Sequence, residues 1–342
     1  MTPNSPLRRY LKAVPGLAPA YRAARFGWRW LCCPRPNRRR QQRVAQVWSE
    51  TLAPTAGAEA SRARGWLAWA PVLRRYVFPQ LGGLDWYHFV KTHAAGLPPE
   101  RGLSLCCGDG STERLFHGCG VCRDWEGVDI SPEAIAACRQ AAHEAGLSAA
   151  LHYRVTDVEH LRLPRARYDL VVGWMGLHHL RSLPRVFHQV KRALRSEGIF
   201  VVNEYVGPVR FQMPARQVEL INECLAMLPR ELRRTGSGDT VEKFVRAPAE
   251  EVAAHDPSEA VSSDQILARL EREFAVKVRI DYGGAILQWA LQEIMPNLHP
   301  DDADHMAWLD RMCEFERRAM ARGDVGSDFT YVIAEKRRKV GD

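Results

Sequence analysis

The sequence predicts an α/β protein with a doubly wound, mostly parallel sheet of seven strands, preceded by N-terminal helices and interrupted by helical cap insertions. After Pro98-Pro99, short apolar runs alternate with amphipathic stretches, which is the pattern of strands joined by crossover helices. The first apolar run ends in the turn Gly108-Asp109-Gly110, at the strand end where open α/β sheets bind ligands. A hydrophobic content of 46% over 342 residues is sufficient for a core of this size.

The order of the elements follows from this alternation. Strands are expected at 103–107, 125–130, 150–155, 168–174 and 198–206, and two later ones at 274–282 and 328–335. Helices are expected between them at 111–117, 132–145 and 183–194. The predicted divisions are a basic arm at 1–45, a helical N-terminal cap at 46–98, a ligand-binding α/β core at 99–206 and 263–337, and helical substrate-cap insertions at 207–262 and 284–327.

The positive charge belongs to the arm. The net charge is +8, but the first 49 residues carry eleven Arg or Lys and no Asp or Glu, which leaves 37 basic and 40 acidic side chains for the rest. Frequent prolines argue against a long helix there, so we expect a solvated tail. Because Trp28 and Trp30 lie among the arginines, weak contact with a membrane surface is the first alternative and RNA contact the second.

The cysteines and the absence of a long apolar run point to a cytoplasmic protein. No stretch approaches the length of a membrane span, and the nine scattered cysteines do not form a disulfide pattern. Cys119-Gly-Val-Cys122 has the spacing of half a zinc site, but only the adjacent Cys106 and Cys107 could complete it. We therefore expect no metal.

The charge of the glycine turn indicates which ligand it binds. Where a dinucleotide-binding loop has its third glycine, this chain has Glu113, and Asp109 adds a second negative charge beside the predicted helix start. A pyrophosphate would be repelled there. S-adenosylmethionine carries no phosphate and presents an ammonium and a sulfonium, so an acidic loop suits it.

Two downstream carboxylates follow the next apolar runs. Asp129 lies nineteen residues after Gly110, about where a carboxylate meets ribose hydroxyls in this architecture, although it could instead cap the helix near Pro132. Asp157 could accept a hydrogen bond from the adenine amino group, or be a carboxylate in a surface turn.

Four motifs then identify a resemblance. Leu-Cys-Cys-Gly-Asp-Gly-Ser-Thr-Glu, Gly-Val-Asp-Ile-Ser, Val-Thr-Asp-Val and Tyr-Asp-Leu-Val-Val-Gly-Trp-Met-Gly-Leu-His-His-Leu occur in order. They resemble the motifs of class I S-adenosylmethionine-dependent methyltransferases of the bacterial small-molecule type (methyltransferase type 11/12-like), which have a Rossmann-like fold. The resemblance covers residues 100–210 well. The chain departs from the family pattern at Ser104, where an acidic residue is usual, and at Cys106, where the first glycine belongs.

The resemblance implies residue roles. Gly108, Gly110 and Glu113 would surround the methionine part, and Gly173 and Trp174 would line the methyl-donor pocket. The expected cofactor-binding set for S-adenosylmethionine is Cys106, Gly108, Asp109, Gly110, Glu113, Asp129, Ile130, Asp157, Val158, Gly173 and Trp174.

Candidates for catalysis follow the fourth and fifth strands. His178, His179 and Glu204 could act as a general base or contact the substrate, although a His pair here is more often structural. Tyr205, Arg210 and Trp174 are expected to contact the substrate, with Arg210 as a lid residue. The acidic stretch from His255 to Glu259 is expected to be a solvated turn.

The leading hypothesis is methyl transfer to oxygen or nitrogen of a small-molecule acceptor such as a metabolite, saccharide or natural product. One alternative is an RNA or protein methyltransferase that uses the arm as a tether, and nucleic acid is the less favoured partner. Another is a non-catalytic scaffold of the same fold. The sequence carries no indication of oligomeric state.

Overall fold

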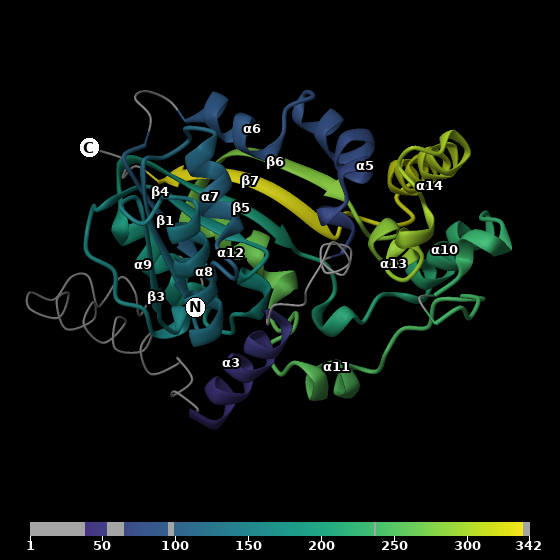
Figure 1. The fold of residues 1–342 in the computed structure, drawn as a ribbon, viewed down its shortest axis with the longest axis horizontal. Helices are drawn as coiled ribbons and strands as arrows, with labels where there is room; N and C mark the ends of the chain where they lie inside the picture. Colours follow the sequence, from purple (N-terminus) through teal and green to yellow (C-terminus); the bar gives the residue numbers. More distant parts are fainter. Residues whose placement is uncertain (1–37, 53–64, 95–98, 236, 338–342) are drawn as a thin grey trace, which may run out of the picture. The chain divides into compact units, whose positions relative to one another are not determined.

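The computed structural model describes residues 38–52, 65–94, 99–235 and 237–337, and within them the expected seven-stranded sheet is present (Figure 1). The strand order is β3-β2-β1-β4-β5-β7-β6, with only β7 antiparallel to its neighbours. The strands are β1 (Arg101–Leu105), β2 (Asp124–Asp129), β3 (Leu151–Val155), β4 (Tyr168–Trp174), β5 (Leu194–Tyr205), β6 (Phe274–Gly283) and β7 (Phe329–Lys336). The fold class predicted from the sequence is confirmed.

Helices cover both faces of the sheet because alternate residues of each strand point to opposite sides. In β4, Leu170 and Val172 belong to one buried cluster and Val171 to the other. The first cluster takes side chains from α7 (Ser111–Gly118) and α8 (Pro132–Glu144). The second takes side chains from α9 (Leu183–Ala193) and α12 (Ile266–Glu273). Two hydrophobic cores therefore fix the positions of the strand ends.

The N-terminal cap packs its aromatic side chains onto the first face of the sheet. It consists of η1 (Trp66–Ala68), α5 (Ala70–Val72), η2 (Leu73–Val77), η3 (Phe78–Leu81) and α6 (Trp86–His93). Trp86 stacks on Tyr331 of β7 with 5.2 Å between ring centroids and meets Trp174 edge-on at 5.8 Å. Aromatic pairs of this kind add to the stabilisation from area burial. The cap is therefore tied to the strand end that carries Trp174.

The two insertions mix helices with extended chain. They contain η6 (Val209–Phe211), α10 (Ala215–Ala226), η7 (Arg230–Arg233), α11 (Ala249–His255), α13 (Leu287–Leu291), η9 (Met295–Asn297) and α14 (Ala303–Ala321). Figure 1 shows α10, α13 and α14 together at the right of the view. Residues 241–248 are not helical, so the first insertion is less helical than expected. Buried Glu316 of α14 accepts hydrogen bonds from the backbone N–H groups of Gly284, Ile286 and Leu287, which joins the second insertion to the end of β6.

The predicted arm boundary at residue 45 differs from the structure. Helix α3 (Arg38–Leu52) begins inside the predicted arm, and its buried Val44 and Val47 give it an apolar side. Three-residue spacing of apolar side chains is typical of an amphipathic helix, a signal that the preceding prolines obscured. The remainder of the arm, 1–37, lies outside the described residues.

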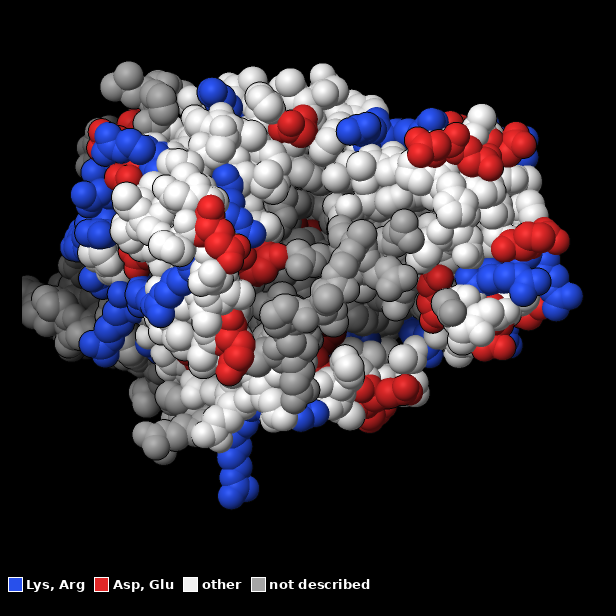
Figure 2. Space-filling view, viewed as in Figure 1, with Lys and Arg blue, Asp and Glu red and all other residues white. Residues whose placement is uncertain are grey.

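Acidic and basic side chains intermingle on the surface. On the face shown in Figure 2, both signs gather over α10 and α14, where Arg216 pairs with Glu219 and Arg318 with Glu314. Among the described helices, none is both long enough and apolar enough to cross a bilayer.

Candidate functional site

A cavity of about 770 Å³ opens at the carboxyl ends of β1, β2 and β4. This is the edge at which open α/β sheets bind ligands. Its walls come from the glycine turn, the strand ends with the loops that follow them, α3, the pair Ser258-Glu259 and α13. The lining residues are Arg40, Gln41, Val44, Trp48, Gly65, Cys106, Cys107, Gly108, Asp109, Ser111, Thr112, Asp129, Ile130, Asp157, Val158, Glu159, Trp174, Met175, Gly176, His179, Leu180, Ser258, Glu259, Gln288 and Gln292.

The turn after β1 exposes backbone to the cavity. Gly108 has φ +54° and nothing within 4 Å of where a Cβ would be, so its backbone faces open space. Cys106 has the same φ of +54°, a left-handed conformation that favours glycine. The position at which the chain departs from the family glycine therefore keeps a glycine-like backbone. Burial raises the pKa of the Cys106 thiol well above its usual range, so the thiol stays protonated.

Asp129 is held at the end of β2 next to this turn. One carboxylate oxygen accepts a hydrogen bond from the Gly108 N–H at 3.0 Å and the other from the Ser131 N–H at 2.9 Å. The side chain is buried at 7% exposure and lines the cavity, and burial raises its pKa despite these bonds. Ser131, not Asp129, caps α8 through the Ala134 N–H. The helix-capping alternative for Asp129 is therefore wrong.

A second carboxylate site lies after β3. Asp157 caps η4 (Val158–His160) through the Glu159 N–H at 2.8 Å and accepts hydrogen bonds from Gln41 and from His160. Arg40 lies 3.5 Å from the carboxylate of Glu159. Helix α3 thus covers the carboxylates that follow β3.

The cavity suits a positively charged nucleoside without phosphate. Its walls carry Asp109, Asp129, Asp157, Glu159 and Glu259. Arg40 is the arginine among its lining residues, and it faces a carboxylate. An ammonium or a sulfonium gains from such a lining, whereas a pyrophosphate is repelled. The residues present therefore fit S-adenosylmethionine.

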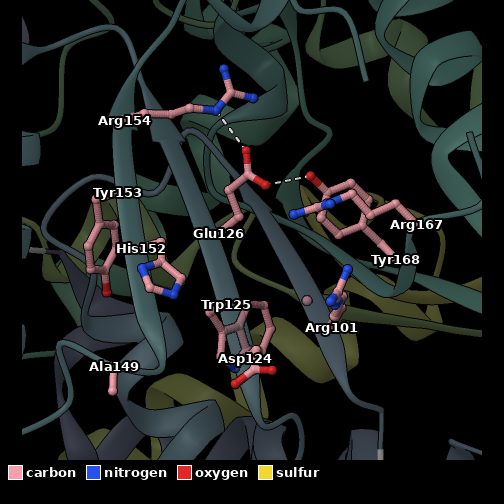
Figure 3. A pocket seen from close by; sticks show the side chains of 11 residues that line it. Arg101, Asp124, Trp125, Glu126, Ala149, His152, Tyr153, Arg154, Arg167 and Tyr168 are labelled. Atoms are coloured by element: carbon pink, nitrogen blue, oxygen red, sulfur yellow. Dashed lines mark hydrogen bonds and ion pairs between the residues drawn. The ribbon is translucent and has the colours of Figure 1, made fainter. Parts of the chain in front are cut away.

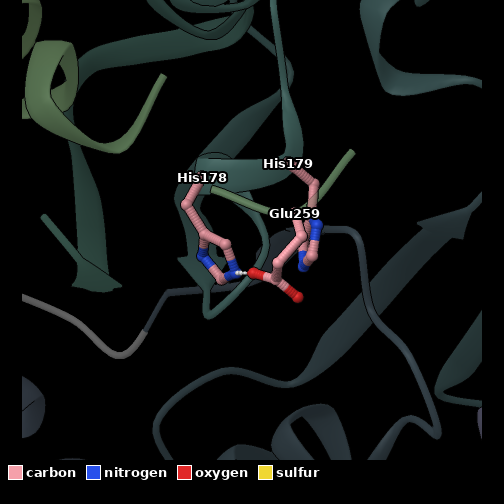
Figure 4. A group of neighbouring side chains, drawn as sticks. All are labelled: His178, His179 and Glu259. Atoms are coloured by element: carbon pink, nitrogen blue, oxygen red, sulfur yellow. Dashed lines mark ion pairs between the residues drawn. The ribbon is translucent and has the colours of Figure 1, made fainter. Parts of the chain in front are cut away.

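Behind the wall at the opposite end of the cavity, a charged histidine joins two carboxylates. His178 Nδ1 bonds to Glu204, and its Nε2 lies 3.4 Å from Glu259 (Figure 4). Burial alone would lower the pKa of His178, but Glu204 and Glu259 outweigh it and raise the pKa to about 10. Burial raises the pKa of Glu259, but the hydrogen bond from His178 and the charges of His178 and Arg210 outweigh burial and lower this pKa overall. His178 is therefore an imidazolium in an ion-pair chain.

His179 has different surroundings. Its Nδ1 lies 3.2 Å from Ser258 Oγ and 3.6 Å from a carboxylate oxygen of Asp256, and its ring meets Trp48 edge-on. Burial, and next the charge of His178, lower the pKa of His179 below its usual value. In the described part of the chain, one group of His, Cys, Asp and Glu has ligand atoms close enough to hold a metal, namely His178, His179 and Glu259, within 4.8 Å of one another.

Segment 255–259 is not a solvated turn. Asp256 and Ser258 are 4% and 1% exposed. Arg210 holds the segment by donating hydrogen bonds to the backbone carbonyls of Asp256, Pro257 and Glu259. The sequence prediction was wrong because the charge of these residues is satisfied inside the protein instead of by water.

Several residues predicted to touch ligands lie behind the cavity wall instead. Arg210 donates hydrogen bonds to backbone carbonyl groups and does not line the cavity. Tyr205 is 2% exposed, and its hydroxyl donates a hydrogen bond to the Pro208 carbonyl. Glu204 is fully buried and accepts hydrogen bonds from the backbone of Gly176 and Leu177 as well as His178.

The same holds for three residues expected at the cofactor. Glu113 is fully buried, and burial raises its pKa to about 7. A Cβ on Gly110 would lie 2.8 Å from the Tyr153 hydroxyl, and one on Gly173 would lie 2.8 Å from Leu177. These glycines permit close packing beneath the site, so they shape the cavity without lining it.

Other lining residues were missed by sequence reasoning. They come from α3, from the position directly after β4 and from the two insertions: Arg40, Gln41, Val44, Trp48, Met175, Ser258, Glu259, Gln288 and Gln292. The four-residue spacing of Val44 and Trp48 and of Gln288 and Gln292 places each pair on one helix face. That spacing was a usable signal, whereas nothing in the sequence marks Ser258.

A second cavity, of about 350 Å³, lies at the amino ends of the strands (Figure 3). Glu126 at its centre accepts a hydrogen bond from Arg154 at 2.7 Å and one from the Tyr168 hydroxyl at 2.6 Å. Its central carboxylate is thus already paired, and the cavity lies away from the glycine turn.

Comparison with known proteins bears on the domain type and the fold. Residues 103–198 match the family model described as "Methyltransferase domain". Geranyl diphosphate C-methyltransferase from Streptomyces coelicolor A3(2), solved with Mg²⁺, geranyl diphosphate and S-adenosyl-L-homocysteine, is 14% identical with a TM-score of 0.51, over 88% of this chain and 100% of that chain. Haemonchus contortus phosphoethanolamine N-methyltransferase 2, solved with S-adenosyl-L-methionine, is 14% identical with a TM-score of 0.50, over 85% of this chain and 60% of that chain. At these identities the two structures support the fold.

Proposed function

Because this chain carries a class I S-adenosylmethionine-dependent methyltransferase domain at residues 103–198, we propose that the enzyme methylates an oxygen or a nitrogen of a small-molecule acceptor. The observation that carries the proposal is the single cavity that joins the Asp129 carboxylate to the His179 and Glu259 side chains. S-adenosylmethionine supplies a methyl group on a sulfonium, which is already a good electrophile. The protein's main contribution is then to orient the acceptor.

The proposed cofactor contacts follow the strand ends. Asp129 would hold the ribose hydroxyls, since its carboxylate faces the cavity beside the Gly108 N–H. Asp157 would meet the adenine amino group, in place of or together with its present partner Gln41. Ile130 and Val158, adjacent to these carboxylates, would flank the base.

The remaining contacts surround the reacting methyl group. Cys106 and Asp109 would lie against the methionine part of the cofactor. Trp174 would contact both cofactor and acceptor, since it lies at the end of β4 and lines the cavity.

The size and charge of the cavity favour a small acceptor. Ligand pockets for small molecules have volumes of roughly 300–1,000 Å³, and this cavity, at about 770 Å³, lies within that range. Beyond Trp174, its wall carries the amides of Gln288 and Gln292 together with Trp48. The many carboxylates in the wall disfavour a nucleic-acid acceptor. The tether hypothesis depends on the arm, of which 1–37 lie outside the described residues.

Calorimetric titration with S-adenosylmethionine tests the proposal. We expect one binding site, and we expect Asp129→Ala to weaken binding by a factor on the order of 10 to 100, because a hydrogen bond to a charged group contributes roughly 1.5–3 kcal/mol. Asp301→Ala, at an exposed position, is the matched control and should bind as the wild type does. Absence of heat at millimolar cofactor would favour the scaffold hypothesis, and unchanged affinity of Asp129→Ala would remove the proposed ribose contact.

A further inference from the structure

We propose that His179 is the general base for an acceptor hydroxyl, and that Ser258 and Asp256 position it by keeping its proton on Nδ1. The inference rests on the proposed function and deepens it, since it names a hydroxyl as the acceptor group. The residues that position His179 lie in segment 255–259, which is buried in part instead of solvated.

Of the three predicted catalytic residues, two already have their reactive atoms occupied. His178 has a carboxylate at each ring nitrogen, Glu204 at Nδ1 and Glu259 at Nε2. The Glu204 carboxylate accepts hydrogen bonds from the backbone N–H groups of Gly176 at 2.9 Å and Leu177 at 2.6 Å, and it has no exposed surface. Neither residue lines the cavity, whereas His179 does.

The hydrogen-bond chain behind His179 determines its tautomer. Ser258 Oγ lies 2.6 Å from a carboxylate oxygen of Asp256, which can only accept, so the single hydroxyl proton is donated to Asp256. The Ser258 oxygen is then left as an acceptor for His179 Nδ1, 3.2 Å away. Nδ1 must carry the proton, and Nε2 keeps its lone pair. Among the described residues, no hydrogen bond reaches Nε2.

The charges around His179 keep the ring neutral. His178 lies 4.1 Å away between ring centroids and is positively charged, while Asp256, Glu259 and Glu204 are the neighbouring carboxylates. Burial and the charge of His178 outweigh these carboxylates and lower the pKa of His179 below its usual value. A neutral imidazole at pH 7 can accept a proton, whereas a protonated one cannot.

In the proposed step, a proton and a methyl group are transferred together. The acceptor O–H gives its proton to Nε2 of His179 while its oxygen forms the bond to the methyl carbon, and the carbon–sulfur bond breaks with its electron pair staying on sulfur. The resulting imidazolium keeps its Nδ1–H···Oγ bond to Ser258, with the Asp256 carboxylate 3.6 Å away to stabilise the charge. The proton is later released to solvent.

Nitrogen NMR of the histidine rings tests the positioning without turnover. Two-bond ¹H–¹⁵N correlations of ¹⁵N-histidine-labelled protein, recorded with S-adenosylhomocysteine bound, should show His179 at pH 7 as the neutral Nδ1–H tautomer and His178 as the imidazolium. His179→Gln assigns the signal, and exposed His143→Gln is the matched control. Ser258→Ala should give a mixture of His179 tautomers. A charged His179, an Nε2–H tautomer, or an unchanged tautomer in Ser258→Ala overturns the proposal.

Turnover gives the second readout, with a panel of methyl glycosides, phenols and primary amines as probes and S-adenosylhomocysteine release as the signal. We expect hydroxyl methylation, a loss of kcat of about 10²–10⁴-fold in His179→Gln, and a loss of about tenfold in Ser258→Ala. Cofactor affinity should stay within twofold of wild type in both variants, which separates this inference from the proposed function. Methylation of amines alone, or full activity of His179→Gln on a hydroxyl, overturns it.

The group formed by His178, His179 and Glu259 supplies a competing arrangement, because the same atoms could hold a divalent metal. Titration with Co²⁺ distinguishes the two. A free imidazole base predicts no visible absorption bands from Co²⁺ coordination. Appearance of such bands, together with their loss in His179→Gln, would assign His179 to a metal and overturn its role as base.

Discussion

The two ends of the cavity are built in different ways. The nucleoside end comes from successive strand ends between Cys106 and Val158, so its residues follow the order of the sheet. The acceptor end gathers Trp48, His179 and Glu259 from three segments far apart in the chain. The geometry of the nucleoside end depends on strand register, which is set by the core. The geometry of the acceptor end depends on buried polar contacts that hold an insertion in place. The two ends should therefore respond separately to mutation.

The largest expected change in stability comes from a substitution that disturbs the acceptor end alone. Glu204→Ala removes the acceptor of the Gly176 and Leu177 N–H groups and leaves the His178 imidazolium without one of its two carboxylates. Breaking a buried ion pair by removing one partner costs roughly 3–5 kcal/mol. We expect a loss of that size in the free energy of unfolding, measured by urea denaturation.

The matched control for this prediction is Glu219→Ala, whose side chain is exposed on α10 and should lose less than about 1 kcal/mol. The folded fraction of Glu204→Ala should still bind S-adenosylmethionine within about threefold of wild type, a change of less than 1 kcal/mol. If cofactor affinity instead falls as far as it does in Asp129→Ala, the two ends are not separable.

The next effect concerns a carboxylate beneath the nucleoside end. Burial raises the pKa of Glu113 from 4.5 to about 7, so the folded protein favours the neutral acid. The resulting stability is fully present below pH 4.5 and is lost as the pH rises to about 7. Relative to Glu113→Gln, the wild type should lose about 3 kcal/mol of unfolding free energy between pH 4.5 and 7.5.

Urea unfolding of both proteins at several pH values measures this difference. Asp328, whose pKa burial also raises to about 7, is present in both and cancels in the comparison. Parallel stability curves for the wild type and Glu113→Gln would show that Glu113 ionises freely, which contradicts its burial.

The contrast between the two ends also explains what the sequence could predict. Hydrophobic alternation placed the strands to within a few residues, and the glycine turn with Asp129 followed from fixed spacing after β1 and β2. Ser258 and Glu259 could not be found this way because their positions depend on hydrogen bonds from Arg210, 46 or more residues earlier in the chain, to backbone carbonyls. Backbone acceptors leave no trace in the residue types of the segment that provides them.

Glu204 and Glu113 show the converse: sequence spacing predicts ligand contacts that the structure does not contain. Both are acidic residues at strand or helix ends next to the ligand edge, where sequence reasoning expects ligand contacts. The structure buries both carboxylates completely. Whether an acidic side chain points into the cavity or behind it depends on rotamer and packing, neither of which is encoded in spacing along the chain.

The smallest expected effect joins the two ends. A Cβ on Gly176 would lie 2.5 Å from the Cβ of Cys106, so Gly176→Ala should destabilise the protein by roughly 1–3 kcal/mol through overpacking. Cys106→Gly removes the clashing atom and relieves the strain of a φ of +54°. Glycine also increases the entropy of the unfolded chain, which lowers the free energy of unfolding and offsets part of that stabilisation. Alone it should change stability by less than about 1 kcal/mol. In the double variant, most of the Gly176→Ala cost should disappear, giving a coupling of about 1–2 kcal/mol in a double-mutant cycle. Additive effects would mean that the turn at Cys106 and the loop at Gly176 do not pack against each other. Mutations at the two ends would then act on stability independently.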